Sequence, residues 1–215
     1  VTGERLRNLA QALAALPSLR QALADNDRAA ALALLVPYNQ GLDQGASQPL
    51  RIHVHDAAKR SWIRVWDPAK SGDDLASFRE TVLEAQRSGK GLHGIEAGRG
   101  GLVLRGVVPV FHPSTADQVI GSLEVYCDLD SMLRQLDARI PTALYDLGTG
   151  VEATTSVATA GKLGDFTILK APAAELADLV DPGLIAASRE APQQVDHDHQ
   201  LVQTRVVSDW RGQPR

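Results

Sequence analysis

The hydrophobic pattern of the chain changes its period near residue 50, and this change most limits the folds available. Before it, leucines recur at steps of three and four residues, as on one face of an α-helix: Leu6, Leu9, Leu13 and Leu16. Pro17 and the acidic turn at residues 25–27 interrupt the helical pattern. From Leu50 onward, hydrophobic and polar residues alternate, as in half-buried β-strands. Blocks of helices and strands in this order predict an α+β fold.

The later segments predict two modules after the helical start. Strands are expected at about residues 51–55, 62–66, 102–111 and 119–127. Between the second and third, Asp73 or Asp74 is expected to cap a helix that carries Leu75, Phe78, Val82 and Ala85 on one face. Beyond them we expect a helix near 131–136, a strand near 143–147, a helix at 172–187 bent at Pro182, and a strand at 201–207. The predicted organisation is therefore a helical segment (1–49), a sheet module (50–130) and a smaller α/β module (131–215).

The amino-acid composition argues against one class of partner and against two structural features. The net charge of −4 argues against nucleic acid as a partner. Cys127 is the single cysteine, which excludes an intramolecular disulfide. No stretch of the sequence is apolar over the ~18–20 residues that span a bilayer. Because the chain starts at Val1 and lacks a signal sequence, we expect it to be a piece of a longer protein.

Alternation sorts the strand residues onto two faces of the predicted sheet. One face is aliphatic, carries Ile52, Val54, Ile63, Val65, Leu102, Leu104, Val108, Val110, Leu123 and Val125, and is expected to pack on the helices. The other face carries His53, His55, Trp62, Arg64, Trp66, Arg105, Glu124 and Tyr126. Tryptophans are unusual on a solvated face, so we expect this second face to be covered.

Covered arginines need partners, because desolvating a guanidinium is costly. Arg64 and Arg105 have two kinds of partner available. Internal carboxylates are one, and the candidates are Asp73, Asp74, Glu96 and Glu124. A small anionic ligand is the other, since the guanidinium fork binds a carboxylate through two hydrogen bonds. The residues alone leave both possibilities open.

Other patterns give weaker signals. His53 and His55 lie two apart on a strand and could both reach a metal, but no third ligand is evident, so we expect no metal and no cofactor. The segment His197–His199 reads as a loop, and the glycines of residues 98–101 lack the Lys-Ser/Thr pair of a phosphate loop. With no Gly-x-Ser-x-Gly or His-Glu-x-x-His motif, a hydrolytic enzyme has the least support. The leucine stripe at residues 6–16 is either core or a dimer seam.

Several strings together resemble one family of sensors. They are Trp62–Pro68, Gly72–Arg79, Gly94–Leu102, Arg105–Pro109 and Ile120–Glu124. Over residues 50–127 the chain is similar to the double Cache extracytoplasmic sensor domains of bacterial chemoreceptors and related transmembrane signalling proteins. The resemblance implies a PAS-like Cache fold behind one long N-terminal helix, a periplasmic location, flanking transmembrane helices outside this sequence, and a homodimer formed through the N-terminal helix. It implies no catalysis.

The resemblance also implies a ligand site in the membrane-distal module, with occupancy relayed through the N-terminal helix. The matching pocket positions are Trp62, Arg64, Trp66, Arg79, Glu96 and Arg105, to which we add Tyr126 and His53 from the same face. We expect a small anionic or zwitterionic metabolite held by the arginines against the tryptophans. The alternative is a dimerisation or partner-binding module in which the arginines and acids form a purely structural network.

Overall fold

The computed structural model describes residues 2–43, 49–98, 101–129, 131–132, 141–146, 160–172, 174–197 and 200–213. The chain divides into two compact units. Unit 1 comprises Val1–Glu96 and Val103–Cys127, and unit 2 comprises Ala97–Leu102 and Asp128–Arg215. The N-terminal helices are therefore part of unit 1, and the main division falls close to residue 130. The expected helix near 131–136 lies mostly outside the described residues.

Unit 1 begins with three helices, α1 (Gly3–Ala14), α2 (Pro17–Ala24) and α3 (Arg28–Asp43). The Thr2 hydroxyl accepts a hydrogen bond from the Arg5 N–H and caps α1. Pro17 has no N–H and occupies the first turn of α2, where none is needed. Asn26 adopts a left-handed backbone conformation (φ 54°) between α2 and α3. These two breaks replace the one long helix that the resemblance implied, at the positions where the sequence interrupts the helical pattern.

The sheet of unit 1 has five strands in the order β2-β1-β5-β4-β3. They are β1 (Arg51–Asp56), β2 (Ser61–Arg64), β3 (Leu92–Gly98), β4 (Gly101–Phe111) and β5 (Val119–Asp128). β1 pairs antiparallel with both β2 and β5. The α+β class and the four predicted strands are confirmed. The sequence analysis missed β3, whose apolar residues are widely spaced among glycine, histidine and glutamate.

A fourth helix, α4 (Glu80–Ser88), begins later than predicted, with Arg79 at its N-cap position. Asp73 binds Arg64 instead of capping a helix. Asp74 forms a β-bridge with Arg60, so the chain is still extended at this point. The helix ends at Gly89 in a left-handed conformation (φ 66°), as is usual for a glycine after a helix.

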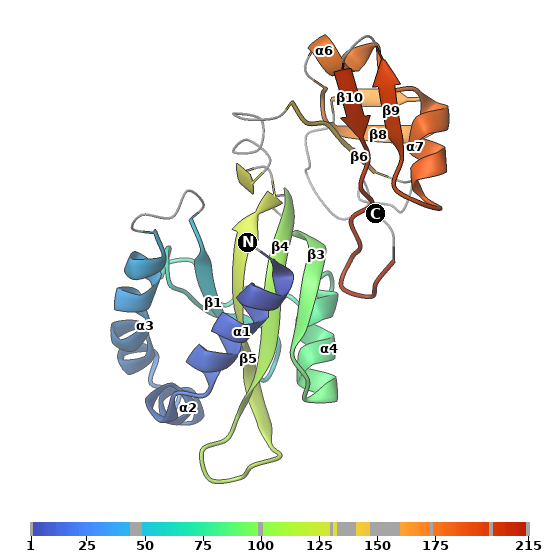
Figure 1. The fold of residues 1–215 in the computed structure, drawn as a ribbon. Coiled ribbons are helices and arrows are strands. Elements are labelled where there is room, and N and C mark those ends of the chain that lie inside the picture. Colours follow the sequence, from blue (N-terminus) through green and yellow to red (C-terminus); the bar gives the residue numbers. More distant parts are fainter. Residues whose placement is uncertain are drawn as a thin grey trace. The chain divides into compact units, whose positions relative to one another are not determined.

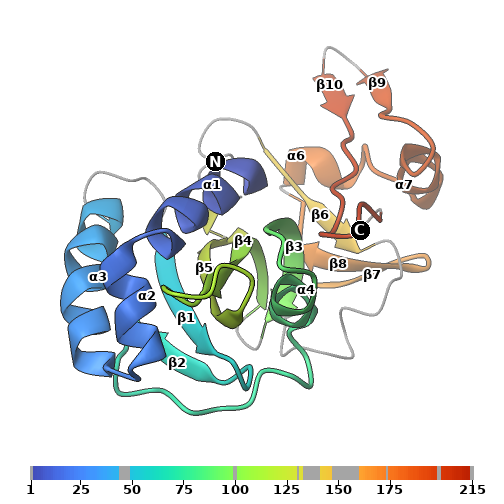
Figure 2. The same ribbon diagram turned by 90° about the horizontal axis from the view of Figure 1, so that it is seen from below.

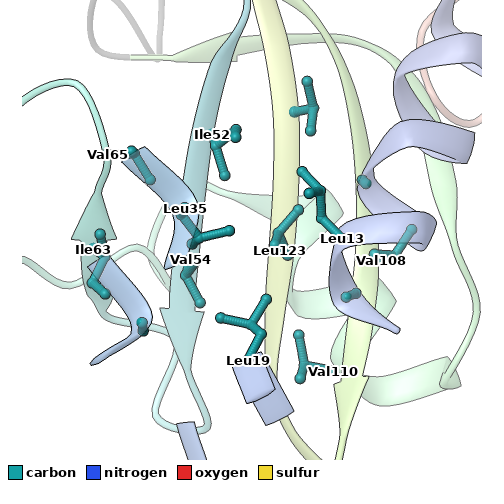
Figure 3. Close-up of a cluster of buried hydrophobic side chains, with 14 of the residues drawn as sticks. Leu13, Leu19, Leu35, Ile52, Val54, Ile63, Val65, Val108, Val110 and Leu123 are labelled. Carbon is teal, nitrogen blue, oxygen red and sulfur yellow. The ribbon is translucent and has the colours of Figure 1, made fainter. Parts of the chain in front are cut away.

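The sheet separates two cores (Figure 1; Figure 2). The helices α1–α3 cover one face, where eight of the ten predicted aliphatic residues of the strands are buried, while Leu102 and Leu104 are partly exposed. Figure 3 shows Leu13, Leu19 and Leu35 of these helices pointing toward Val54 and Leu123 of the sheet. On the other face, the smaller cluster of Val82, Ala85 and Val107 lies between α4 and the sheet. The helix α4 therefore covers the face that carries the polar residues.

Helix α1 packs against β4 at Gly106 without an intervening side chain. A Cβ atom at this position would overlap the backbone N and Cα atoms of Arg7. Only glycine permits this close approach. The backbones of α1 and β4 are therefore in direct contact, one residue along the strand from Arg105.

Unit 2 contains a three-stranded sheet in the order β6-β8-β7 and a two-stranded sheet of β9 and β10. The strands are β6 (Leu144–Asp146), β7 (Gly161–Leu163), β8 (Phe166–Lys170), β9 (Gln194–His197) and β10 (Gln200–Gln203). The single helix predicted for residues 172–187 is two helices, α6 (Ala174–Ala177) and α7 (Pro182–Ser188). The Asp181 carboxylate caps α7 at the predicted bend, and Phe166 and Ile185 form the small core. No helix among the described residues has the length and hydrophobicity of a membrane-spanning segment.

Candidate functional site

The polar face of the unit 1 sheet brings together most of the predicted site residues. β1 contributes His53, β3 Glu96, β4 Arg105 and β5 Glu124, and Arg79 reaches them from the start of α4. All five side chains are buried. We call these five residues, together with His55, the polar cluster.

Glu124 is the centre of the polar cluster, and its side chain is fully buried. Its Oε2 atom accepts hydrogen bonds from Arg79 Nη2 and, at 2.9 Å, from Arg105 Nη1. Its Oε1 atom lies 2.9 Å from His53 Nδ1. Burial alone would raise the pKa of Glu124, but Arg79 and the two histidines outweigh burial and hold this pKa well below its usual range. Glu124 is therefore ionised and neutralises the arginines beside it.

Glu96 connects the sheet to α4. Its carboxylate accepts hydrogen bonds from the Thr81 N–H (2.8 Å), the Thr81 hydroxyl (2.8 Å) and Arg79 Nε (3.1 Å). Burial raises the pKa of Glu96, against the lowering effect of Arg79 and Thr81. Burial also acts to lower the pKa of Arg79, but Glu124 and Glu96 raise it further, so the guanidinium stays charged. The positive charges of the two arginines, Arg79 and Arg105, are thus balanced by the two acids, Glu96 and Glu124.

Arg105 is the most deeply buried arginine of the cluster, with 2% of its surface exposed. Besides the hydrogen bond to Glu124, its guanidinium lies 5.8 Å from the centre of the Tyr126 ring. Its Nε atom is 3.4 Å from Glu96 Oε2 but makes no hydrogen bond. Among the buried side-chain atoms of the described residues, this nitrogen is the one that lacks a hydrogen-bond partner. An unsatisfied charged donor is expensive to bury, and the nearest acceptor, Glu96 Oε2, forms an ion pair with Arg105 but no hydrogen bond to this nitrogen.

The two histidines stand side by side on β1. His55 Nε2 is 3.1 Å from His53 Nδ1, and the ring centres are 4.2 Å apart. The remaining ring nitrogens contact serine hydroxyls, His53 Nε2 that of Ser61 (2.7 Å) and His55 Nδ1 that of Ser122 (2.9 Å). Burial lowers the pKa of His53 to about 3 and also lowers the pKa of His55. Both rings are therefore neutral at pH 7.

Trp66 and Tyr126 form the aromatic part of the polar face. Their rings meet edge to face with centres 5.4 Å apart, and Trp66 meets His53 in the same way at 5.7 Å. The Arg51 guanidinium lies 5.4 Å from the centre of the Trp66 ring. Both aromatic rings are half-buried, so this wall borders the polar cluster on the side that reaches solvent.

Arg64 lies on the same face but binds a separate acid. Its two terminal nitrogens donate to the two carboxylate oxygens of Asp73 at 2.8 and 2.9 Å, and one also donates to the Lys70 carbonyl. The Arg64 side chain is 18% exposed. Of the two kinds of partner left open by the sequence, internal acids pair with both Arg64 and Arg105.

Trp62 lies on the opposite face from the one predicted. Its indole N–H donates to Asn26 Oδ1, and its ring belongs to the core beneath the N-terminal helices. The reason is an irregularity in the pairing of β1 with β2, where Ser61 pairs with His55 and Ile63 pairs with Val54. This β-bulge inserts one residue and interrupts the alternation. Ser61 consequently occupies the polar face in place of Trp62.

The sequence analysis placed His55 and Glu124 on this face, and Glu124 among the candidate partners of the arginines, without including either residue in the site. Thr81, Ser61 and Ser122 were missed altogether, because isolated hydroxyl residues carry no pattern. Arg79 was proposed on the family resemblance alone, whereas Glu96 was also a candidate internal partner of the arginines. A signal for the serines exists only once the strand register is known.

Unit 1 also has a surface hollow of about 550 Å³ away from the polar cluster. The end of α2, the β1–β2 turn and the β4–β5 loop form its walls. Trp62 is the one predicted site residue that lines it, and the rest of the lining mixes small apolar and polar side chains.

Comparison with known proteins identifies relatives by family and by fold. The family model dCache_3, described as "Double sensory domain of two-component sensor kinase", matches residues 2–181. A search of curated proteins gives no match. Among solved structures, the V. cholerae histidine kinase DctB sensor domain is similar at a TM-score of 0.52 and 13% identity, over 96% of this chain and 80% of that one. Methyl-accepting chemotaxis protein X is similar at a TM-score of 0.54 and 16% identity, over 99% of this chain and 90% of that one.

Proposed function

The chain belongs to the dCache_3 family of double sensory domains, and from this premise we propose that it is the extracytoplasmic sensor domain of a transmembrane signalling receptor. Its ligand is a small anionic or zwitterionic metabolite, bound in unit 1 on the polar face of the sheet. The domain acts by binding, and no catalytic step is assigned to it. The receptor is a dimer through the N-terminal helices, with transmembrane segments beyond this sequence and unit 1 distal to the membrane.

The observation that carries the ligand proposal is the Nε atom of Arg105, which is buried and donates no hydrogen bond. A ligand carboxylate with an oxygen aligned to this N–H would complete the hydrogen bonding of the guanidinium. A hydrogen bond to a charged group contributes about 1.5–3 kcal/mol, and micromolar affinity needs about 8 kcal/mol. A hydrogen bond to Arg105 would therefore supply part of this free energy, and burial of the ligand against the Trp66 and Tyr126 rings would have to supply the rest.

The packing of α1 supports a route for the signal. Arg105 and Gly106 are neighbours on β4, and Gly106 touches the α1 backbone at Arg7. A ligand that moves Arg105 would displace the strand on which α1 rests. The ligand would then shift the equilibrium between two arrangements of the N-terminal helices, because it binds one of them more tightly than the other.

A second function is favoured by a different observation. The four charged groups of the polar cluster balance one another, and most of their hydrogen bonds are made internally. Such a network can hold the sheet to α4 without any ligand. In that case the domain would sense through dimerisation or a protein partner.

The first experiment is a thermal-shift screen of amino acids and carboxylates, followed by tryptophan fluorescence titration of any compound that raises the melting temperature. The chain offers matched reporters, because Trp66 lies on the polar face and Trp62 on the helix face. The proposal predicts that Trp66→Phe abolishes the fluorescence change and that Trp62→Phe retains it. A change carried by Trp62 or by Trp210 of unit 2 would place the ligand elsewhere.

The arginine is tested with a substitution that preserves its charge. Arg105→Lys keeps a cation opposite Glu124 but lacks the guanidinium fork. We expect a loss of ligand affinity of tenfold or more in a folded protein. Arg60→Lys, on an exposed side chain, is the control and leaves the affinity unchanged. If no compound in the screen raises the melting temperature, the partner-binding function replaces the ligand-binding one.

A further inference from the structure

We propose that His53, His55 and Glu124 form a binding site for zinc or a similar divalent first-row transition-metal ion. One possible donor atom from each residue lies close to the other two inside unit 1. His53 Nδ1 is 2.9 Å from Glu124 Oε1 and 3.1 Å from His55 Nε2, and His55 Nε2 is 3.6 Å from Glu124 Oε1. All three residues are buried. Glu124 is the third ligand that the spacing of the two histidines did not reveal.

The size of this triangle fits tetrahedral coordination. Zinc bonds to histidine nitrogen and carboxylate oxygen are about 2.0–2.1 Å, which separates neighbouring ligand atoms by roughly 3.3 Å. The three observed separations lie on either side of that value. The spacing of the three atoms therefore allows one metal ion to contact all of them.

The other ring nitrogens are held as metal-binding histidines require. His53 Nε2 and His55 Nδ1 contact the hydroxyls of Ser61 and Ser122. A hydrogen bond at the far nitrogen fixes the tautomer and the ring orientation. Glu124 is anchored in the same way, because Arg79 and Arg105 bind its Oε2 atom and leave Oε1 facing the histidines.

The same three atoms are linked by hydrogen bonds when no metal is present. His53 Nδ1 lies beside Glu124 Oε1 and His55 Nε2, and a neutral ring carries at most one proton on each nitrogen. A metal ion among the three atoms would take the place of the protons on the two facing nitrogens, since a histidine binds a metal through an unprotonated nitrogen.

The types of the three donor atoms indicate which metal ions would bind here. Two imidazoles and one carboxylate suit zinc and its first-row neighbours better than magnesium or calcium, which take all-oxygen sets. Three protein ligands leave a fourth position open, as in zinc sites that bind a water or another small ligand. The charges of Arg79 and Arg105 oppose the ion, so we expect reversible binding that favours an anion at the open position.

The test titrates the chelator-stripped domain with zinc chloride, followed by calorimetry and thermal unfolding. We expect one equivalent of zinc and a higher melting temperature, with no shift from magnesium chloride. Cobalt chloride is the spectroscopic probe, and a tetrahedral site predicts strong visible absorption bands. Each measurement uses the metal alone and needs no knowledge of the metabolite, so its failure is distinct from failure of the proposed function.

Variants locate the bound ion. His53→Gln combined with His55→Gln is expected to remove binding at least a hundredfold. The matched control replaces the other close histidine pair of the sequence, His197 and His199, with glutamine, and retains full binding. X-ray absorption at the zinc edge of the wild-type protein, showing two imidazole ligands, decides the matter if the first variant does not fold. Absence of zinc binding by the wild type, or its loss in the control alone, would overturn the proposal.

Discussion

Arg105 and Glu124 form a buried ion pair between β4 and β5, with Arg105 Nη1 2.9 Å from Glu124 Oε2. Taking both charges out of water is costly, and the pair persists because each has further partners. Glu124 also binds Arg79 and His53, and Arg105 lies beside Glu96. The stability of unit 1 and the function proposed for it therefore depend on the same residues.

Replacing Glu124 with glutamine is expected to destabilise unit 1 strongly. The substitution leaves Arg79 and Arg105 buried with one acid between them, and breaking a buried pair costs about 3–5 kcal/mol. Urea denaturation followed by circular dichroism measures the loss. Glu84→Gln is the control, because Glu84 pairs with Arg87 on an exposed surface of α4, and its denaturation midpoint stays at the wild-type value. Equal midpoints for the two variants would show that the buried network is not stabilising.

Stability is expected to fall as the pH is lowered from about 6.5 toward 3. The folded-state pKa of His53 is about 3, below the ordinary 6.5 of the unfolded chain, because burial disfavours its charged form. Between these values the unfolded state binds the extra proton, so acid favours unfolding by up to ~1.4 kcal/mol per pH unit. His55 acts in the same direction.

The histidine contribution can be isolated by comparing variants at pH 5–6.5 in the presence of a chelator, where carboxylates of ordinary pKa are ionised and the raised pKa of Glu96 affects every variant alike. His53→Gln is expected to flatten the dependence of the unfolding free energy on pH. His93→Gln, on an exposed histidine of β3, is expected to leave the slope unchanged. An identical slope for wild type and His53→Gln would show that His53 is not held neutral.

Gly106→Ala is expected to separate α1 from the sheet. The added methyl group would overlap the Arg7 backbone, which cannot move aside as a flexible side chain can. A lower melting temperature and faster amide hydrogen exchange in α1 are the measurable results. Gly41→Ala is the matched control, because a Cβ there meets no atom within 4 Å and alanine favours the helix by about 1 kcal/mol. Wild-type exchange rates in the Gly106→Ala variant would contradict the close contact.

The two faces of the sheet were predictable because the alternation of a strand is a local property of the sequence. Trp62 was assigned to the wrong face because a bulge depends on the partner strand. The start of α4 was misplaced because Asp73 binds Arg64 rather than the helix, which is a tertiary contact. Glu124 and His53 are in contact although they lie 71 residues apart in the sequence, and this contact can be predicted only when the order of the strands is known. The sequence therefore predicted which types of side chain the site contains better than it predicted which of these side chains contact one another.

The most direct measurement of the central claim is the crystal structure of the domain with the compound selected by the thermal-shift screen. The account predicts density for that compound on the polar face of unit 1, with an acceptor atom in hydrogen-bond distance of Arg105 Nε. Density for the compound in unit 2 or in the hollow beside Trp62, with the arginine–acid network unchanged, would contradict it.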